Sequence, residues 1–467
     1  MNTQHNLITL GLILAMGLTA PALAQNQSDT YTRSAISSNT SVQTNSNASR
    51  QTLHQLIAIA LEQDASRAQL MAQSQATLSS GQAKATLMDP TIKFGFGGIP
   101  VDSFRLDQDP MSNVSLGVMQ KFDRGDTIEL QSNQALQQSQ AVAKQASARE
   151  REVIATVTTL WLELGYNQNA FVILQQQQKW LAQLVESLDT NYALGLSESQ
   201  DVIGAQLKVS QLEQKLVANQ QMQQKLRAQL SEWLGRDWLQ QSPQLEATNQ
   251  LNWSSLEEKI SGITEPQARY NLLMQHPIIQ SIDALVQSAN SQVAIAEEAY
   301  APQFGVEVMY AHREANNMRG EPAPDMVSAY LTLDIPLFTG NKQDKALEAA
   351  QYQVGATKSQ RDAWLSRMES QLSVLLSDRE HTQQRIQRYR DTLLKQAKAQ
   401  LRAVERGYQN NSASFSDIVT SSTNLLAIEL ELERLTTDLN LTTNQIASLI
   451  GGDLSSTPNS NTSAARR

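Results

Sequence analysis

Two short stretches of the chain, 91–99 and 112–122, alternate between apolar and polar residues with a period of two. The apolar positions are Ile92, Phe94, Phe96, Val114, Leu116, Val118 and Phe122. This alternation predicts two β-strands, each with one apolar and one polar face. The polar segment between them predicts a hairpin loop. Because an isolated hairpin is marginally stable in water, this hairpin needs further strands as partners.

Long stretches with helical patterning flank the predicted hairpin. The first runs from Leu53 to about Leu87, the second from about Thr127 to Ala193, and the third from about Ser199 to Leu234. At about 1.5 Å per residue, the second would approach 100 Å in length, which no compact domain requires. Residues 238–268 contain two tryptophans and two prolines and predict an irregular connector.

The chain then repeats this plan. Tyr192–Asp237 matches Tyr408–Asp453 without a gap, and apolar residues recur in both copies at alternating steps of three and four. That spacing is typical of a coiled-coil seam. A second pair of alternating stretches, 303–312 and 326–336, predicts two more strands. We therefore interpret the chain as a tandem duplication, with one repeat at 53–237 and the other at 269–453.

Composition narrows the possible chemistry. The chain has 467 residues, is only 5% aromatic, and carries a net charge of −9 with both signs scattered, so a basic nucleic-acid surface is not indicated. It has no cysteine, which excludes disulfides, thiolate metal sites and a cysteine nucleophile. The five histidines are scattered, with no two at ligand spacing. Neither a metal site nor a cofactor is predicted.

The two ends of the chain read differently from the repeats. The apolar run Leu7–Leu18 and the small-x-small pattern at 22–24 predict a secretory signal peptide over 1–24. An uncleaved membrane anchor is the alternative, although the run is short for a span of about 20 residues. Residues 25–52, rich in Ser, Thr, Asn and Gln, predict a disordered lead-in, and residues 454–467 a disordered tail. In a bacterium, export would lead to the periplasm, the outer membrane or the medium.

Four amphipathic strands of about ten residues suit a transmembrane barrel. Four strands cannot close a barrel, and an open edge is not tolerated in lipid, so several chains must share one. Two chains would give eight strands with a filled interior, and three would give twelve strands with a lumen. The alternative is a soluble coiled-coil protein with two hairpins, which leaves the signal peptide and the alternation unexplained.

The duplicated plan, the paired strands and the helix turns resemble the TolC family of trimeric outer-membrane channels over about Leu53–Asp453. The turn motif reads Asn-Tyr-Ala-Leu-Gly-Leu-Ser at 191–197 and continues through Asp201; its echo runs from Gly407 through Asp417. The loop at 99–111 is similar to that of channels grouped with heavy-metal efflux systems.

The resemblance implies a mainly α protein with a small β part. A tandem-duplicated, long-helix coiled-coil tunnel would stand in the periplasm, and four strands per chain would form a shared 12-stranded trimeric transmembrane β-barrel in the cell outer membrane. It implies no enzyme activity and a homotrimer that contacts outer-membrane lipid, a periplasmic adaptor and an inner-membrane pump of the resistance-nodulation-division (RND) type. The implied function is the exit duct of a tripartite efflux system, with metal ions among the candidate substrates. A channel of a type I protein secretion system is the alternative, and a solute-specific porin represents a different class.

The resemblance also assigns site residues. Asp201, Tyr408 and Asp417 match family positions at the periplasmic gate, where a trimer would carry six carboxylates that attract cations. Alternatively each aspartate favours the start of its helix, and both roles can hold. The predicted adaptor-docking tips are Leu194, Gly195, Leu196, Asn410, Asn411 and Ser412. Ala413 stands where some members have an arginine, so an arginine gate latch is not expected.

Overall fold

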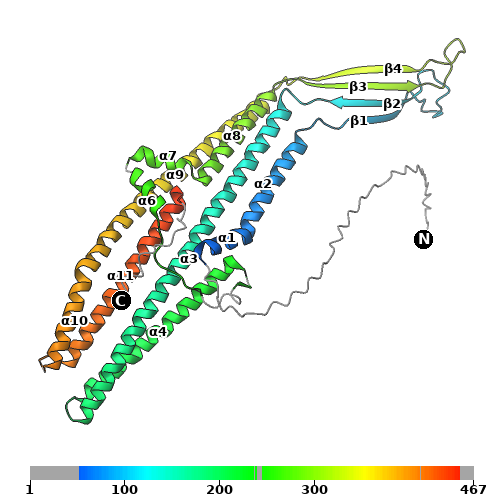
Figure 1. The fold of residues 1–467 in the computed structure, drawn as a ribbon. Coiled ribbons are helices and arrows are strands. Elements are labelled where there is room, and N and C mark those ends of the chain that lie inside the picture. The colour runs from blue at the N-terminus through cyan, green and yellow to red at the C-terminus, as the bar shows by residue number, and fades with distance from the viewer. Residues whose placement is uncertain (1–51, 236, 239–244, 264, 411, 453–467) are drawn as a thin grey trace, which may run out of the picture. The chain divides into compact units, whose positions relative to one another are not determined.

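The computed structural model describes residues 52–235, 237–238, 245–263, 265–410 and 412–452. The chain divides into two units, Met1–Ala48 and Ser49–Arg467, and every described residue belongs to the second. The predicted signal peptide, the tail and all but the last residue of the predicted lead-in lie outside the described residues. The prediction of a mainly helical protein with a small β part is confirmed (Figure 1).

Four helices make up the first half of the unit: α1 (Leu53–Gln63), α2 (Ala65–Lys84), α3 (Thr127–Ala193) and α4 (Ser199–Leu234). The helical stretch predicted from Leu53 to Leu87 is interrupted at Asp64. The Asp64 carboxylate accepts a hydrogen bond from Arg67 N at 2.8 Å and caps α2, and it also accepts one from Arg149 Nε of α3 at 2.9 Å. Asp64 therefore caps α2 and links the start of α2 to α3.

The second half has the same kinds of element. They are α8 (Pro277–Glu298), α9 (Gln343–Arg388), the π-helical turn η1 (Tyr389–Leu393), α10 (Leu394–Gln409) and α11 (Phe415–Ile450). α4 and α11 each contain 36 residues. Both end at a glycine with positive φ, Gly235 at +87° and Gly451 at +73°. Glycine adopts this conformation at little cost, which explains why both helices stop there.

The connector is less irregular than its prolines predict. It contains α6 (Ser254–Gly262), and α7 (Pro266–Met274) begins at its end. Leu256 of α6 is fully buried in an apolar cluster with α7, α9 and α11, so packing on this cluster orders the segment. Earlier in the connector, the backbone passes so close to α3 that a Cβ on Gly165 would lie 2.2 Å from Thr248 C.

Four antiparallel strands form one sheet in the order β1-β2-β3-β4. They are β1 (Thr91–Gly97), β2 (Asn113–Lys121), β3 (Gln303–His312) and β4 (Met326–Asp334). β1, β2 and β4 are each two residues shorter than predicted. The register aligns Phe94 with Leu116, Leu116 with Tyr310, and Tyr310 with Val327. The predicted apolar positions of all four strands thus share one face.

The two faces of the sheet differ in character. On the apolar face, Ile92, Phe94 and Leu116 are 72%, 66% and 55% exposed. Strands that face water rarely expose so many large apolar side chains side by side. On the opposite face, Lys93 Nζ lies 2.7 Å from Glu307 Oε2 and ties β1 to β3 across β2. An exposed apolar face backed by a polar one requires an apolar environment on one side of the sheet.

Two of the apolar clusters each hold the helices of one half together. One contains Leu56 of α1, Val157 of α3 and Leu230 of α4, and the other contains Leu256, Leu372 of α9 and Ile446 of α11. All of these side chains are fully buried. Within the part of the chain that the structure describes, no helix combines the length and the apolar character that a membrane span requires.

Candidate functional site

The first candidate tip is the turn between α3 and α4. Gly195 has a φ of +72°, which L side chains rarely adopt, and no atom lies within 4 Å of the position that a Cβ would take. Gly195 N donates to Tyr192 O at 2.9 Å and closes the turn. Leu194 and Leu196 are 68% and 75% exposed on either side of the glycine. The turn therefore presents two leucines to solvent.

The second candidate tip joins α10 to α11. Ser412 N donates to Gly407 O at 2.7 Å, and Asn410 N donates to Arg406 O at 3.1 Å. Asn410 and Ser412 are exposed. Asn411, the remaining predicted docking residue, lies outside the described residues. The second tip thus offers polar groups where the first offers leucines.

An apolar cluster brings the two tips together. Its buried members are Leu188 of α3, Val202 and Ala205 of α4, and Phe415 of α11. Phe415 is the first residue of α11 and is only 6% exposed. Tyr408, one of the three predicted gate residues, packs against this cluster from the end of α10. The joint between the tips is therefore apolar.

Asp417 caps the start of α11. Its Oδ2 accepts hydrogen bonds from Ser414 N at 2.9 Å and from Ser414 Oγ at 2.7 Å, while Asp417 N donates to Ser414 Oγ at 3.2 Å. This reciprocal arrangement is a capping box. The hydrogen bonds from Ser414 lower the pKa of the Asp417 carboxyl. Asp417 is exposed, so its carboxylate remains in contact with solvent despite the capping hydrogen bonds.

Asp201 occupies the equivalent place in α4 but is not held in the same way. It lies in the first turn, where a carboxylate is favoured by the helix dipole, and its backbone N donates to Glu198 O at 3.1 Å. None of the described residues forms a hydrogen bond or ion pair with its carboxylate. Of the two predicted gate aspartates, Asp201 is the one without a capping partner.

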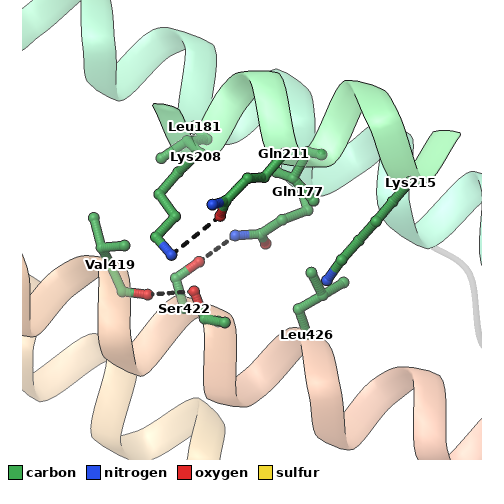
Figure 2. Close-up of a pocket in the computed structure, with 10 residues that line it drawn as sticks. Gln177, Leu181, Lys208, Gln211, Lys215, Val419, Ser422 and Leu426 are labelled. Carbon is green, nitrogen blue, oxygen red and sulfur yellow. Dashed lines mark hydrogen bonds between the residues drawn. The ribbon is translucent and has the colours of Figure 1, made fainter. Parts of the chain in front are cut away.

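A small pocket of about 50 Å³ lies where α3 and α4 meet α11. Figure 2 shows Lys208 and Lys215 of α4 reaching toward the α11 residues that line it. Lys208 Nζ donates to Gln211 Oε1 at 3.2 Å, and Gln177 Nε2 of α3 donates to Ser422 Oγ of α11. Polar side chains therefore join the two halves of the unit beside the apolar joint.

Sequence reasoning missed Phe415 and Ser414. The pattern Ser-x-x-Asp at 414–417 is a capping-box signature and could have predicted the Ser414–Asp417 pair. Nothing local could have predicted that Phe415 meets Leu188, because the two are far apart in the sequence.

Comparison with known proteins supports the predicted resemblance. Residues 268–452 match the family model described as outer membrane efflux protein. The matched segment is less than half of the chain and covers most of the second repeat, which resembles this family. The match confirms the predicted resemblance to outer-membrane efflux channels and the predicted outer-membrane location.

Solved structures show the same fold. The chain is similar to the transmembrane channel CusC, with 14% identity over 86% of this chain and 92% of that one at a TM-score of 0.70. VceC from Vibrio cholerae has 17% identity over 86% and 97% of the two chains at 0.69. The outer membrane channel MtrE of Neisseria gonorrhoeae has 16% identity over 86% and 89% at 0.65. No match was found among curated protein sequences.

Proposed function

We propose that three copies of this chain form a closed barrel of twelve strands with a lumen. The support is the sheet itself: β1 and β4 are edge strands with no partner strand among the described residues, and the apolar face is exposed. Unpaired edges are not tolerated in lipid, so each edge must pair with the edge of another copy. Twelve strands leave a water-filled passage, whereas eight would be filled by side chains.

Mass measurement of the detergent-solubilised protein tests this assembly. The expected value is about 150 kDa for three mature chains, since one full chain has a mass of 51.6 kDa. The chain has no cysteine, so single cysteines placed along β1 and β4 would report edge pairing against no background. Paired β1 and β4 positions should give cross-linked trimers upon oxidation. A stable monomer in membranes would contradict the assembly.

The proposed activity is passive conduction. The trimer is the outer-membrane exit duct of a tripartite efflux system, which receives substrates from an inner-membrane RND pump through a periplasmic adaptor. The helix turns close the periplasmic end, with Asp201, Tyr408 and Asp417 at the gate. The exposed leucines of the first tip and the polar second tip form the docking surface for the adaptor. Heavy-metal ions are the substrate class that the loop at 99–111 favours.

A bulky substitution at the first tip tests whether this turn is the docking surface for the adaptor. Gly195→Trp should abolish efflux while the trimer still inserts into the outer membrane. Gly195→Ala introduces the same backbone strain without the bulk and should retain efflux. Gly355→Trp is the second control, because Gly355 lies on α9 with open space around it. Normal efflux by well-expressed Gly195→Trp would exclude the tip as the docking surface.

Deletion of the adaptor gene separates the proposed duct from other channels. An efflux duct should conduct nothing without its adaptor, whereas a porin would leak solutes. Pump genes beside this one would identify the cargo: an RND pump supports efflux, and an ATP-driven exporter beside a large secreted protein supports type I secretion.

A further inference from the structure

A cavity of about 770 Å³ lies away from the tips, where α1, α3, α6 and the end of α11 meet. Its volume falls within the range of about 300–1,000 Å³ that is typical of sites for small molecules. Residues from both halves of the unit line it, including Ile154 of α3, Gln280 of α8 and Asn444 of α11. An occupant would therefore contact both halves at once.

The charged groups in this cavity are all basic. Arg151 of α3 and Lys259 of α6 line it together with His54, and there is no aspartate or glutamate among the described residues of its wall. Lys259 Nζ donates to Gly451 O at 3.0 Å. Arg151 reaches the same residue, because a Cβ on Gly451 would lie 3.3 Å from Arg151 Nη2. Two cationic side chains thus converge on the end of α11.

Arg151 has no counter-charge within the part of the chain that the structure describes. It is half-buried, and no hydrogen bond or ion pair with another described residue holds its guanidinium. The neighbouring arginine, Arg149, is paired with Asp64 and with Glu152 at 2.9 and 3.0 Å. Burial lowers the pKa of Arg151, since it costs the charged form its hydration. A half-buried charge without a partner is unfavourable unless a ligand supplies one.

The neighbouring histidine does not supply the missing charge. Arg151 also lines an adjoining cavity of about 380 Å³ together with His276 and Glu152. Burial and the positive charge of Arg151 lower the pKa of His276 to about 4, so His276 is neutral at pH 7. Its Nδ1 accepts a hydrogen bond from Ile278 N at 3.1 Å. Glu152 is occupied by Arg149 and points to solvent, with 62% of its side chain exposed.

The remaining wall suits a polar ligand. The amides Gln275, Gln280 and Asn444 and the hydroxyl of Ser448 line the large cavity, with the Trp253 indole beside them. Amides can donate to oxygens that the guanidinium leaves free, and a guanidinium binds carboxylate and phosphate oxygens in bidentate geometry.

We propose that this cavity binds a small anion that carries a carboxylate or phosphate group, with Arg151 as its main partner and Lys259 as the second cation. The site lies far along the helices from the tips and does not depend on the proposed cargo. Because residues of both halves line the cavity, the bound anion stabilises the fold of the whole unit.

Thermal unfolding and titration calorimetry of the full chain in detergent test the site at pH 7. Inorganic phosphate and citrate are the probes, and sodium chloride at matched ionic strength is the reference. Phosphate or citrate should raise the Tm beyond chloride and bind with one site per chain, and the tighter of the two identifies the group recognised. Equal Tm values in all three salts, with no heat of binding, would overturn the proposal.

Substitutions locate the binding. Arg151→Gln should weaken anion binding at least tenfold. Arg151→Lys keeps the positive charge but loses the bidentate guanidinium, and it should weaken binding less. Arg402→Gln removes an exposed guanidinium of α10 outside the cavity and should leave binding unchanged. Wild-type affinity in Arg151→Gln would overturn the assignment. If that variant fails to fold, Lys259→Gln decides: weaker binding supports the site and unchanged binding refutes it.

Discussion

The reciprocal hydrogen bonds of Ser414 and Asp417 allow helix capping and gating to be separated. Ser414→Ala and Asp417→Ala both destroy the capping box, but only the second removes a carboxylate from the proposed gate. Loss of an N-cap serine typically costs about 1 kcal/mol. In a chain larger than about 250 residues, this corresponds to a fall in Tm of less than about 2 °C. Neither variant should therefore lose the trimer.

The electrical consequence should differ between the two variants. In the proposed trimer, Asp201 and Asp417 would supply six carboxylates to the gate, and Asp417→Ala would remove half of them. Like charges confined in a pore attract divalent cations, which block the closed channel. Ser414→Ala should retain this block, Asp417→Ala should weaken it, and the double change with Asp201→Ala should remove it.

Single-channel recording in a planar bilayer, with divalent cations added on the periplasmic side, measures the block. Equal block in wild type, Ser414→Ala and Asp417→Ala would show that Asp417 only caps α11 and that the gate lies elsewhere. A loss of block in Ser414→Ala as large as that in Asp417→Ala would show that helix capping, and not charge, controls the passage.

Three further predictions concern stability and closure. The pKa of Asp417 is lowered in the folded protein, so its carboxylate contributes fully to folding stability above the pKa of an unfolded aspartate. This stabilisation is lost as the pH falls through the folded-state pKa. The Tm difference between wild type and Asp417→Ala, measured by circular dichroism, should therefore vanish in acid. Gly165→Val should destabilise the protein strongly in denaturant titrations, because a Cβ there would lie 2.2 Å from the Thr248 backbone, whereas Gly355→Val, in open space, should not match that loss. Phe415→Ala should cost about 3–5 kcal/mol of packing between the tips and raise the spontaneous conductance of the channel, and an unchanged conductance would contradict an apolar joint.

The sequence predicted the long helices well because their ends carry local signals. α3 and α4 begin and end at the predicted residues, since Gly195 and Gly235 impose positive φ where the chain must turn. The interruption at Asp64 was missed because Arg149 of another helix helps to hold it. The strands were predicted by alternation, but their ends depend on pairing, which no single strand encodes.

The candidate site was predictable only in part. The turn motifs located both tips, since each is a short segment with its own signature. The joint between them was not predictable, because Leu188, Val202 and Phe415 come from three helices that meet only in the folded chain. The cavity around Arg151 has the same origin, because its wall comes from α1, α3, α6, α8 and α11. No local pattern shows that Arg151 has no partner among the described residues.

The pairing of β2 with β3 has a consequence for how such a chain could arise. β1 with β2, and β3 with β4, are hairpins of neighbouring segments. β2 and β3 are far apart in the sequence, and their antiparallel pairing aligns Lys121 with Gly305. Two separate half-length chains could form the same antiparallel contact. Six half-length chains would then provide as many strands as three full ones. Joining the halves covalently would replace a contact between molecules by one within a molecule. It would also allow the two halves to differ, as the leucine-rich first tip differs from the polar second tip.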